Sequence, residues 1–262
     1  MSRETRAQGP AVRFMPATGD RHKAVLARNR LLLLLTFASG SIDAICFLGL
    51  GKVFTAFQTG NFVFLGLRIA GAPGPHVSSV LVSMGAFAGG VLAATQLLSP
   101  TRGSSVWPRR VTLVLGLSVA AHAAFLALWL AVSGRPALTA ADFLIGTSAL
   151  AMGVQTAAVF SLGIQGVFTT AATATVTVLS GDSAHWANTR PERHRLAALL
   201  ITLTAGAIAG GLLIVHVREY APLVPLVATA LVVVLAAIVF PARQRSIQAS
   251  AAEKQQNPAV AA

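Results

Sequence analysis

The chain of 262 residues is 55% hydrophobic and only 11% charged, whereas ordinary soluble domains carry roughly 25% charged residues. Its net charge of +12 would suit a nucleic-acid-binding protein, but the basic residues lie between and outside the apolar runs, without interleaved aromatic residues to stack on bases. The composition excludes a soluble domain, argues against a nucleic-acid partner and predicts a protein whose main partner is the lipid bilayer.

Residues 1–30 form a basic segment that holds seven Lys and Arg residues among Ala, Gly and Pro. Such a segment cannot bury a core, so we expect a disordered cytoplasmic tail that can touch anionic lipid. A cleaved signal peptide is the alternative, but the charged leader is too long for one. Cys46 is the only cysteine, which excludes an intrachain disulfide.

Long runs without a charge follow, each close to the roughly 20 residues that a helix needs to cross about 30 Å of hydrocarbon. The runs lack the apolar/polar alternation of barrel strands. We therefore expect an all-α, polytopic transmembrane helical bundle. The runs cover residues 77–98, 111–132, 143–162, 196–217 and 223–240.

The sequence resembles itself at two places. Residues 40–66 align without a gap on residues 154–180, with identities that include Phe54/Phe168 and Thr59/Thr173. Further on, GAFAGGVL aligns on GAIAGGLL with six of eight positions identical. Because transporter folds commonly contain such repeats, we interpret the pattern as a duplication.

The duplication divides the chain into a first membrane repeat, residues 31–135, and a second, residues 142–240, followed by a polar C-terminal tail, residues 241–262. Two shorter apolar segments, residues 53–70 and 167–179, decide the topology. If both cross the membrane, there are eight spans and parallel halves; if both re-enter, there are six spans and inverted halves. The Lys and Arg distribution places both termini in the cytoplasm in either case and leaves six to eight membrane segments open.

Polar residues interrupt the first short segment at 58–61, and Asp43 is the only acidic residue within an apolar span. Polar groups at membrane depth are tolerated against protein or a water-filled cavity, and an ionisable one must pair, protonate or meet water. We expect a substrate-binding site near the bilayer midplane, with Asp43 as a proton carrier or cation ligand. Its residues would be Asp43, Gln58, Thr59, Gly60, Asn61, Gln155, Thr173 and Thr175.

Structural interpretations of the same residues stay open. Asp43 would cap a helix that restarts after Gly40, or pair with Lys52. Gly60 would allow tight helix packing, and Asn61 would bond a neighbouring carbonyl group.

Other polar and small residues have structural explanations. The glycine pairs Gly85/Gly89 and Gly206/Gly210 have the spacing that lets helices approach closely. His122 lies alone in an apolar run, where we expect a hydrogen bond across helices. The sequence shows no catalytic motif, metal-ligand spacing or cofactor motif, so we predict neither an enzyme nor a bound metal or cofactor.

The stretch SGSIDAICFLGLGKVFTAFQTGNFVFLGLRIAG, residues 39–71, resembles the signature of the YoaK-like family of multi-pass bacterial membrane proteins, a domain of unknown function. The resemblance implies a location in the bacterial inner membrane and no activity. Family members tend to carry a second Thr-Gly in the later half, where this chain has Ala174. The matching residues are Gly40, Asp43, Val53, Phe54, Thr59, Gly60 and Asn61.

The leading hypothesis is a secondary transporter or channel for an unidentified small solute, coupled to protons through Asp43. The alternative is a non-transporting scaffold, sensor or partner subunit, and an intramembrane enzyme comes third. Association into a homo-oligomer is compatible with all three.

Overall fold

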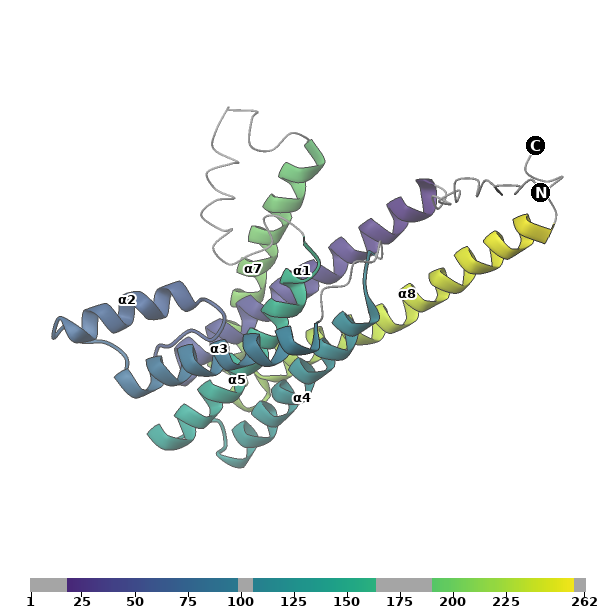
Figure 1. Ribbon diagram of the computed structural model, residues 1–262. Helices are drawn as coiled ribbons and strands as arrows, with labels where there is room; N and C mark the ends of the chain where they lie inside the picture. The colour runs from purple at the N-terminus through teal and green to yellow at the C-terminus, as the bar shows by residue number, and fades with distance from the viewer. Residues whose placement is uncertain (1–17, 99–105, 164–189, 257–262) are drawn as a thin grey trace, which may run out of the picture.

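The computed structural model describes residues 18–98, 106–163 and 190–256 (Figure 1), and in these residues it contains helices and no strand. The predicted all-α fold is confirmed. In chain order the helices are α1 (Thr18–Gly49), α2 (Gln58–Ile69), α3 (Val77–Leu97), α4 (Arg109–Ala131), α5 (Leu138–Phe160), α7 (Arg190–His216), the single 3-10 turn η1 (Arg218–Tyr220) and α8 (Leu223–Gln256).

Within the described residues, six helical segments are long and apolar enough to cross a membrane, and they correspond to α1, α3, α4, α5, α7 and α8. The helix α2 is not among them, because its 12 residues rise only about 18 Å against roughly 30 Å of hydrocarbon. The first short segment, 53–70, therefore does not supply a full span. The second, 167–179, lies outside the described residues.

The helix ends gather at two opposite ends of the bundle. One buried cluster, which defines the A end, joins the starts of α1 and α4 to the ends of α3 and α5 and to the end of the apolar part of α8, through Ala24, Trp107, Ala94, Ala158 and Phe240. The other cluster defines the B end. It joins the ends of α1, α4 and α7 to the starts of α3, α5 and α8 through Cys46, Phe125, Ile214, Val80, Ala141 and Ala221.

This grouping fixes the path of the chain. The first helix ends and α3 begins at the B end, so α2 leaves the bundle and returns to it at that same end. Figure 1 shows α2 beside α3, and shows the start of α1 and the end of α8 on one side of the molecule.

Glycines make the closest helix contacts. A Cβ on Gly206 or Gly210 of α7 would overlap a main-chain carbonyl oxygen of α1, at Phe37 and Ser41 respectively, and Gly40 of α1 meets α7 in the same way. The predicted close packing at the second glycine pair therefore matches the geometry of α7.

The first glycine pair behaves differently. A Cβ at Gly85 or Gly89 would meet nothing within 4 Å, so the packing prediction for this pair is corrected. The close approach of α3 is made by the neighbouring Gly90, which is buried against the carbonyl oxygen of Leu150, while Gly153 of α5 lies against Phe87. The sequence motif identified the right helix but the wrong face.

Two boundaries also differ from expectation. Residues 18–30 were predicted to belong to a disordered tail, but they form the first turns of α1. This stretch is rich in Ala, Leu, Arg and Lys, which favour helix, and Ala24 is buried at the A end. At the other terminus α8 continues past residue 240 to Gln256, so the predicted polar tail is helical over most of its length.

The buried histidine of α4 corrects another prediction. His122 is 1% exposed, and neither ring nitrogen has a hydrogen-bond partner in the described part of the chain. The hydrogen bond that we expected across helices is therefore not formed there.

Candidate functional site

Asp43 holds the segment that links α1 to α2. After α1 the chain reverses through Gly51 and Lys52, both with positive φ, of 97° and 66°. Asp43 Oδ1 then accepts hydrogen bonds from the backbone N–H groups of Thr55 at 2.7 Å and Ala56 at 2.8 Å, and Oδ2 accepts one from Phe57 at 3.0 Å. These amides belong to the three residues just before α2, so Asp43 fixes the linking segment and does not cap the helix itself.

Asn61 holds the same segment from α2. Its Oδ1 accepts from the backbone N–H of Phe54 at 3.1 Å, and its Nδ2 donates to the carbonyl oxygen of Phe54 at 2.7 Å. Ser83 of α3 donates to that carbonyl oxygen at 2.6 Å. Asn61 and Ser83 are both fully buried, so these bonds satisfy main-chain groups that water cannot reach.

Hydroxyl groups extend this network to α5. Ser148 Oγ donates to Thr55 Oγ1 at 3.1 Å, and Thr55 Oγ1 lies 3.3 Å from Asp43 Oδ1. Gln58 Nε2 donates to the carbonyl oxygen of Thr55 at 2.9 Å and to Ser83 Oγ at 3.2 Å. We call the whole set the Asp43 cluster; its members are Asp43, Thr55, Gln58, Asn61, Ser83 and Ser148.

Four phenylalanines pack around the same loop. Phe54 stacks on Phe47 of α1 with ring centroids 5.1 Å apart and on Phe64 of α2 at 5.8 Å, and it meets Phe57 edge-on at 5.3 Å. A Cβ at Gly60 would lie 2.8 Å from the rings of Phe54 and Phe57. Glycine at this position therefore leaves space for the aromatic packing.

The structure brings together only some of the predicted site residues. Asp43, Gln58 and Asn61 share one network, whereas Thr59 is exposed. Gln155 lies elsewhere: its Nε2 donates to the carbonyl oxygen of Leu35 at 3.2 Å and to Ser39 Oγ at 3.1 Å, between α5 and α1. Thr173 and Thr175 lie outside the described residues.

Three members of the cluster are not predicted by the sequence pattern: Thr55, Ser83 and Ser148. Each is a small hydroxyl residue in an apolar stretch, a pattern that also occurs wherever a hydroxyl group bonds its own helix. The only available signal was the closeness of Thr55 to Gln58 along the chain.

The geometry also decides between the interpretations of Asp43. The helix α1 runs without a break through Gly40, so Asp43 caps no restarted helix and instead bonds the segment that precedes α2. No ion pair joins Asp43 to Lys52 among the residues that the structure describes. Asp43 lies six residues before the end of α1, about 9 Å along its axis, so the cluster is nearer the B end than the middle of the bundle.

Arg218 connects several helix ends at the B end of the bundle. Its Nε donates to the carbonyl oxygen of Gly134 at 2.6 Å, in the turn between α4 and α5, and a terminal nitrogen lies 3.5 Å from the carbonyl oxygen of Gly49 at the end of α1. The guanidinium stands 5.6 Å from the ring centre of Trp129, whose indole N–H donates to the Arg218 carbonyl oxygen at 3.0 Å. One arginine thus connects three helix ends.

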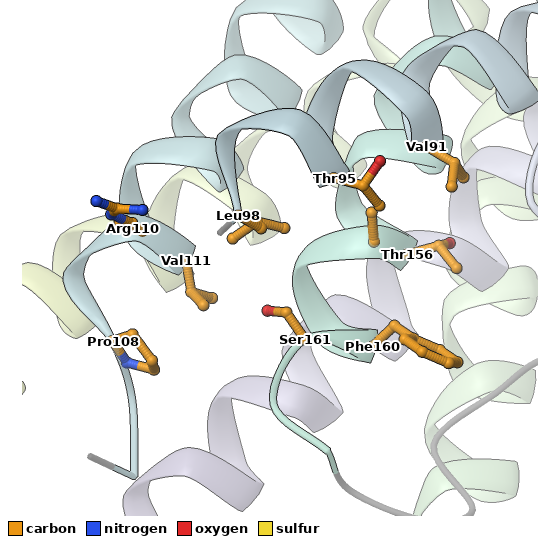
Figure 2. A pocket seen from close by; sticks show the side chains of 10 residues that line it. Val91, Thr95, Leu98, Pro108, Arg110, Val111, Thr156, Phe160 and Ser161 are labelled. Atoms are coloured by element: carbon orange, nitrogen blue, oxygen red, sulfur yellow. The ribbon is translucent and has the colours of Figure 1, made fainter. Parts of the chain in front are cut away.

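At the A end, α3, α4 and α5 surround a cavity of about 580 Å³ (Figure 2). Its walls are mainly apolar, with the hydroxyl group of Ser161 turned toward Val111 and the charged residue Arg110 on the α4 side. We call it the A-end cavity. Its lining residues are Val91, Thr95, Leu98, Pro108, Arg110, Val111, Thr156, Ala157, Phe160 and Ser161.

A bundle of long apolar helices with a hydrogen-bonded polar cluster among them defines a multi-pass integral membrane protein. Residues 31–236 match the family model described as "Protein of unknown function (DUF1275)", and the chain belongs to that family.

The chain is also 36% identical over 159 residues to the UPF0700 transmembrane protein YoaK of Bacillus subtilis (strain 168), a match that covers 61% of this chain and 68% of the relative. The resemblance to YoaK-like membrane proteins is confirmed. No solved structure matches the chain.

Proposed function

We propose that the protein is a secondary transporter of the bacterial inner membrane for a small solute. The solute enters the A-end cavity, and the Asp43 cluster closes the B end. The observation that carries this proposal is the asymmetry of the bundle, with an open cavity of about 580 Å³ at one end and a hydrogen-bonded, aromatic-packed segment at the other.

The helix pairing supports a duplicated transporter architecture. In the proposed repeat, α1, α3 and α4 correspond to α5, α7 and α8. The helix α1 packs on α7 and α8, while α5 packs on α3 and α4. If the two halves are exchanged, the α1/α7 pair becomes the α5/α3 pair and the α1/α8 pair becomes the α5/α4 pair, as expected for a duplication. Because α1 runs from the A end to the B end and α5 runs the opposite way, the halves are inverted, a common arrangement in secondary transporters.

The charge distribution orients the bundle. In the described ranges of this six-span arrangement, the B end carries four Lys and Arg residues, namely Lys52, Arg68, Arg135 and Arg218. The other 12 Lys and Arg residues of these ranges belong to the A side. The positive-inside rule then places the A end and both termini in the cytoplasm.

The Asp43 cluster has the properties of a gate. Asp43 and Asn61 bond the main chain of the loop, so water can replace these hydrogen bonds when the loop moves away from the bundle. An ionised carboxylate only accepts hydrogen bonds, and three backbone N–H groups face Asp43. A proton on Asp43 would remove part of this acceptor capacity and loosen the loop, which couples proton arrival to opening of the B end.

A scaffold or partner subunit is the second candidate. It is favoured by the hydrogen bonds that both carboxylate oxygens of Asp43 accept, which a purely structural residue would also make. In that case the cluster never opens, and the A-end cavity is unrelated to it.

Cysteine accessibility separates the two functions without knowledge of the solute. Cys46, the only cysteine, is buried and is replaced by Ala. Single cysteines are then introduced at Thr156 in the A-end cavity and at Ser148 beneath the loop. Labelling by a membrane-impermeant maleimide is measured from each side of oriented vesicles, with and without Asp43→Asn.

A transporter predicts opposite responses. Asp43→Asn should speed labelling at position 148 from the B side and slow it at position 156 from the A side, because the two openings alternate. Asp142→Asn is the matched control, because the Asp142 carboxylate accepts a hydrogen bond from Ser79 and does not belong to the Asp43 cluster. Unchanged labelling at both positions, or a parallel rise at both, would favour the scaffold.

A comparison of metabolites between cells that lack the protein and cells that overproduce it can then identify the solute.

A further inference from the structure

The A-end cavity carries charge of one sign only. Among the described residues that line it, Arg110 is the single charged residue, and none is Asp, Glu or His. Figure 2 shows Arg110 on the α4 side of the cavity and Val91 on the other side. A ligand in this cavity therefore meets a positive group at one side and apolar side chains away from it.

The charge of Arg110 is available to a ligand. Its side chain is exposed, and no carboxylate of the described ranges pairs with it. The helix α4 begins beside it, at Arg109, and Pro108 gives this helix start no side-chain cap. Because the free N–H groups at a helix start carry positive partial charge, they add to the charge of Arg110 and favour an anion.

The hydroxyl groups of the cavity are bonded mainly within their own helices. Thr95 Oγ1 donates to the carbonyl oxygen of Leu92 at 2.9 Å, and Ser161 Oγ donates to that of Ala158 at 2.7 Å. A sugar or polyol needs many hydrogen-bond partners when it leaves water, and these two hydroxyl groups no longer offer a donor. Apart from its charged group, the ligand should therefore have an apolar body.

The proposed repeat argues against a cation. In the alignment of the two halves, Asp43 corresponds to Ala157, which is buried at the wall of the A-end cavity. The second half thus has no carboxylate at the position where the first half has one. A cation in this cavity would meet the like charge of Arg110 and no acidic side chain among the lining residues.

The size of the cavity argues against a small inorganic anion. Cavities that bind small organic molecules measure roughly 300–1,000 Å³, and the A-end cavity measures about 580 Å³. The helices α3 and α4 both pack on α5 but touch each other little, which leaves this width between them. Since one water molecule takes about 30 Å³ of liquid, an ion as small as chloride would contact only a small part of the walls.

We propose that the solute is an organic anion, namely a carboxylate with an apolar body. The guanidinium of Arg110 can donate two parallel hydrogen bonds to the carboxylate, and the body lies against Val91, Leu98 and Val111. The role of this anion as a solute rests on the proposed transport function, but its binding can be measured without transport. The Asp43 cluster lies at the other end of the bundle and takes no part in this binding.

The test measures binding to the full chain in detergent by isothermal titration calorimetry. The probes are benzoate, naphthoate and octanoate, each compared with its neutral amide, and acetate serves as an anion without an apolar body. The first variant is Arg110→Gln. Its matched control is Arg109→Gln, which removes the same charge from the adjacent exposed residue outside the cavity wall. A second pair, Ala157→Asp and Ala157→Asn, adds to the wall a charged or a neutral side chain of the same size.

We expect at least one of the three carboxylates to bind roughly tenfold or more tightly than its amide and than acetate. Arg110→Gln and Ala157→Asp should each weaken this binding by roughly tenfold or more, whereas both controls should change it by less than about threefold. Arg110 is exposed, so its substitution should leave the fold intact and decides the result if Ala157→Asp does not fold. The bound carboxylate should also slow maleimide labelling of Thr156→Cys, which locates it in the cavity.

Several outcomes would overturn the proposal: binding of none of the carboxylates, equal binding of a carboxylate and its amide, or equal effects of Arg110→Gln and Arg109→Gln. Acetate binding as tight as that of the larger carboxylates would show a free-anion site and refute the apolar body. The cysteine labelling described above tests transport separately. Carboxylate binding without alternating labelling would keep the anion site and refute transport, whereas alternating labelling without carboxylate binding would refute the anion assignment alone.

Discussion

Asp43→Asn tests whether the carboxylate holds the loop in place. The substitution keeps the size of the side chain but turns one acceptor into an NH₂ donor. With the amide oxygen at the Oδ1 position, the bonds from Thr55 and Ala56 remain but are no longer charge-assisted. The NH₂ group then faces the N–H of Phe57, so that bond is lost.

The magnitude follows from these three bonds. Phe57 is exposed, so its N–H can turn to water, and the loss of its bond costs about 0.5–1.5 kcal/mol. Converting a charge-assisted bond to a neutral one loses about 1 kcal/mol, and this applies to two bonds. The free energy of opening the loop should therefore fall by roughly 2.5–3.5 kcal/mol, which corresponds to an opening equilibrium shifted on the order of 100-fold.

Hydrogen exchange measures this shift directly. The backbone amides of Thr55, Ala56 and Phe57 should exchange on the order of 100-fold faster in Asp43→Asn than in the wild type, while amides in the middle of α4 stay protected. Asp142→Asn is the control and should leave the three amides unchanged. Acceleration below tenfold, or equal acceleration in the control, would refute the role of Asp43 in holding the loop.

Three further predictions concern stability, each measured by denaturation in detergent. Gly206→Val should destabilise the protein by several kcal/mol, because its side chain would overlap the α1 main chain, whereas Gly89→Val should be nearly neutral; equal effects would contradict the glycine contacts described above. Arg218→Ala should lose about 1.5–3 kcal/mol with its charged hydrogen bonds, and a neutral result would show that the B-end contacts carry little energy. His122→Leu should be neutral or stabilising, since it removes a buried imidazole without partners among the described residues, and a marked loss of stability would reveal a partner elsewhere.

Hydropathy predicted the main features of the fold because membrane spans depend on length and apolarity, which are local properties. The polar interruption at 58–61 and the depth of Asp43 likewise indicated a special segment, and both lie in one network. The start of α1 at Thr18 differs from the prediction because Lys and Arg are common in disordered segments and also favour helix.

The partners of Asp43 were not predictable from residue types. Asp43 bonds main-chain amides 12 to 14 residues further on, and main-chain groups are present at every position of a sequence. The same limit applies to the glycines. Gly89 and Gly90 are adjacent, and only the direction that α3 turns toward α5 decides which of them is in contact.

The two hydrogen bonds between Asn61 and Phe54 determine where the chain tolerates insertions. Asn61 bonds both the N–H and the carbonyl group of Phe54, as a neighbouring strand would. Asp43 accepts hydrogen bonds from the backbone N–H groups of the next three residues, 55–57. The stretch from Asp43 to Asn61, 19 residues long, is therefore anchored at both ends and has a fixed length. An insertion of one residue among positions 54–57 would move Phe54 out of register with one anchor or the other, whereas the exposed turn at Gly51 and Lys52 is the place where extra length would cost least.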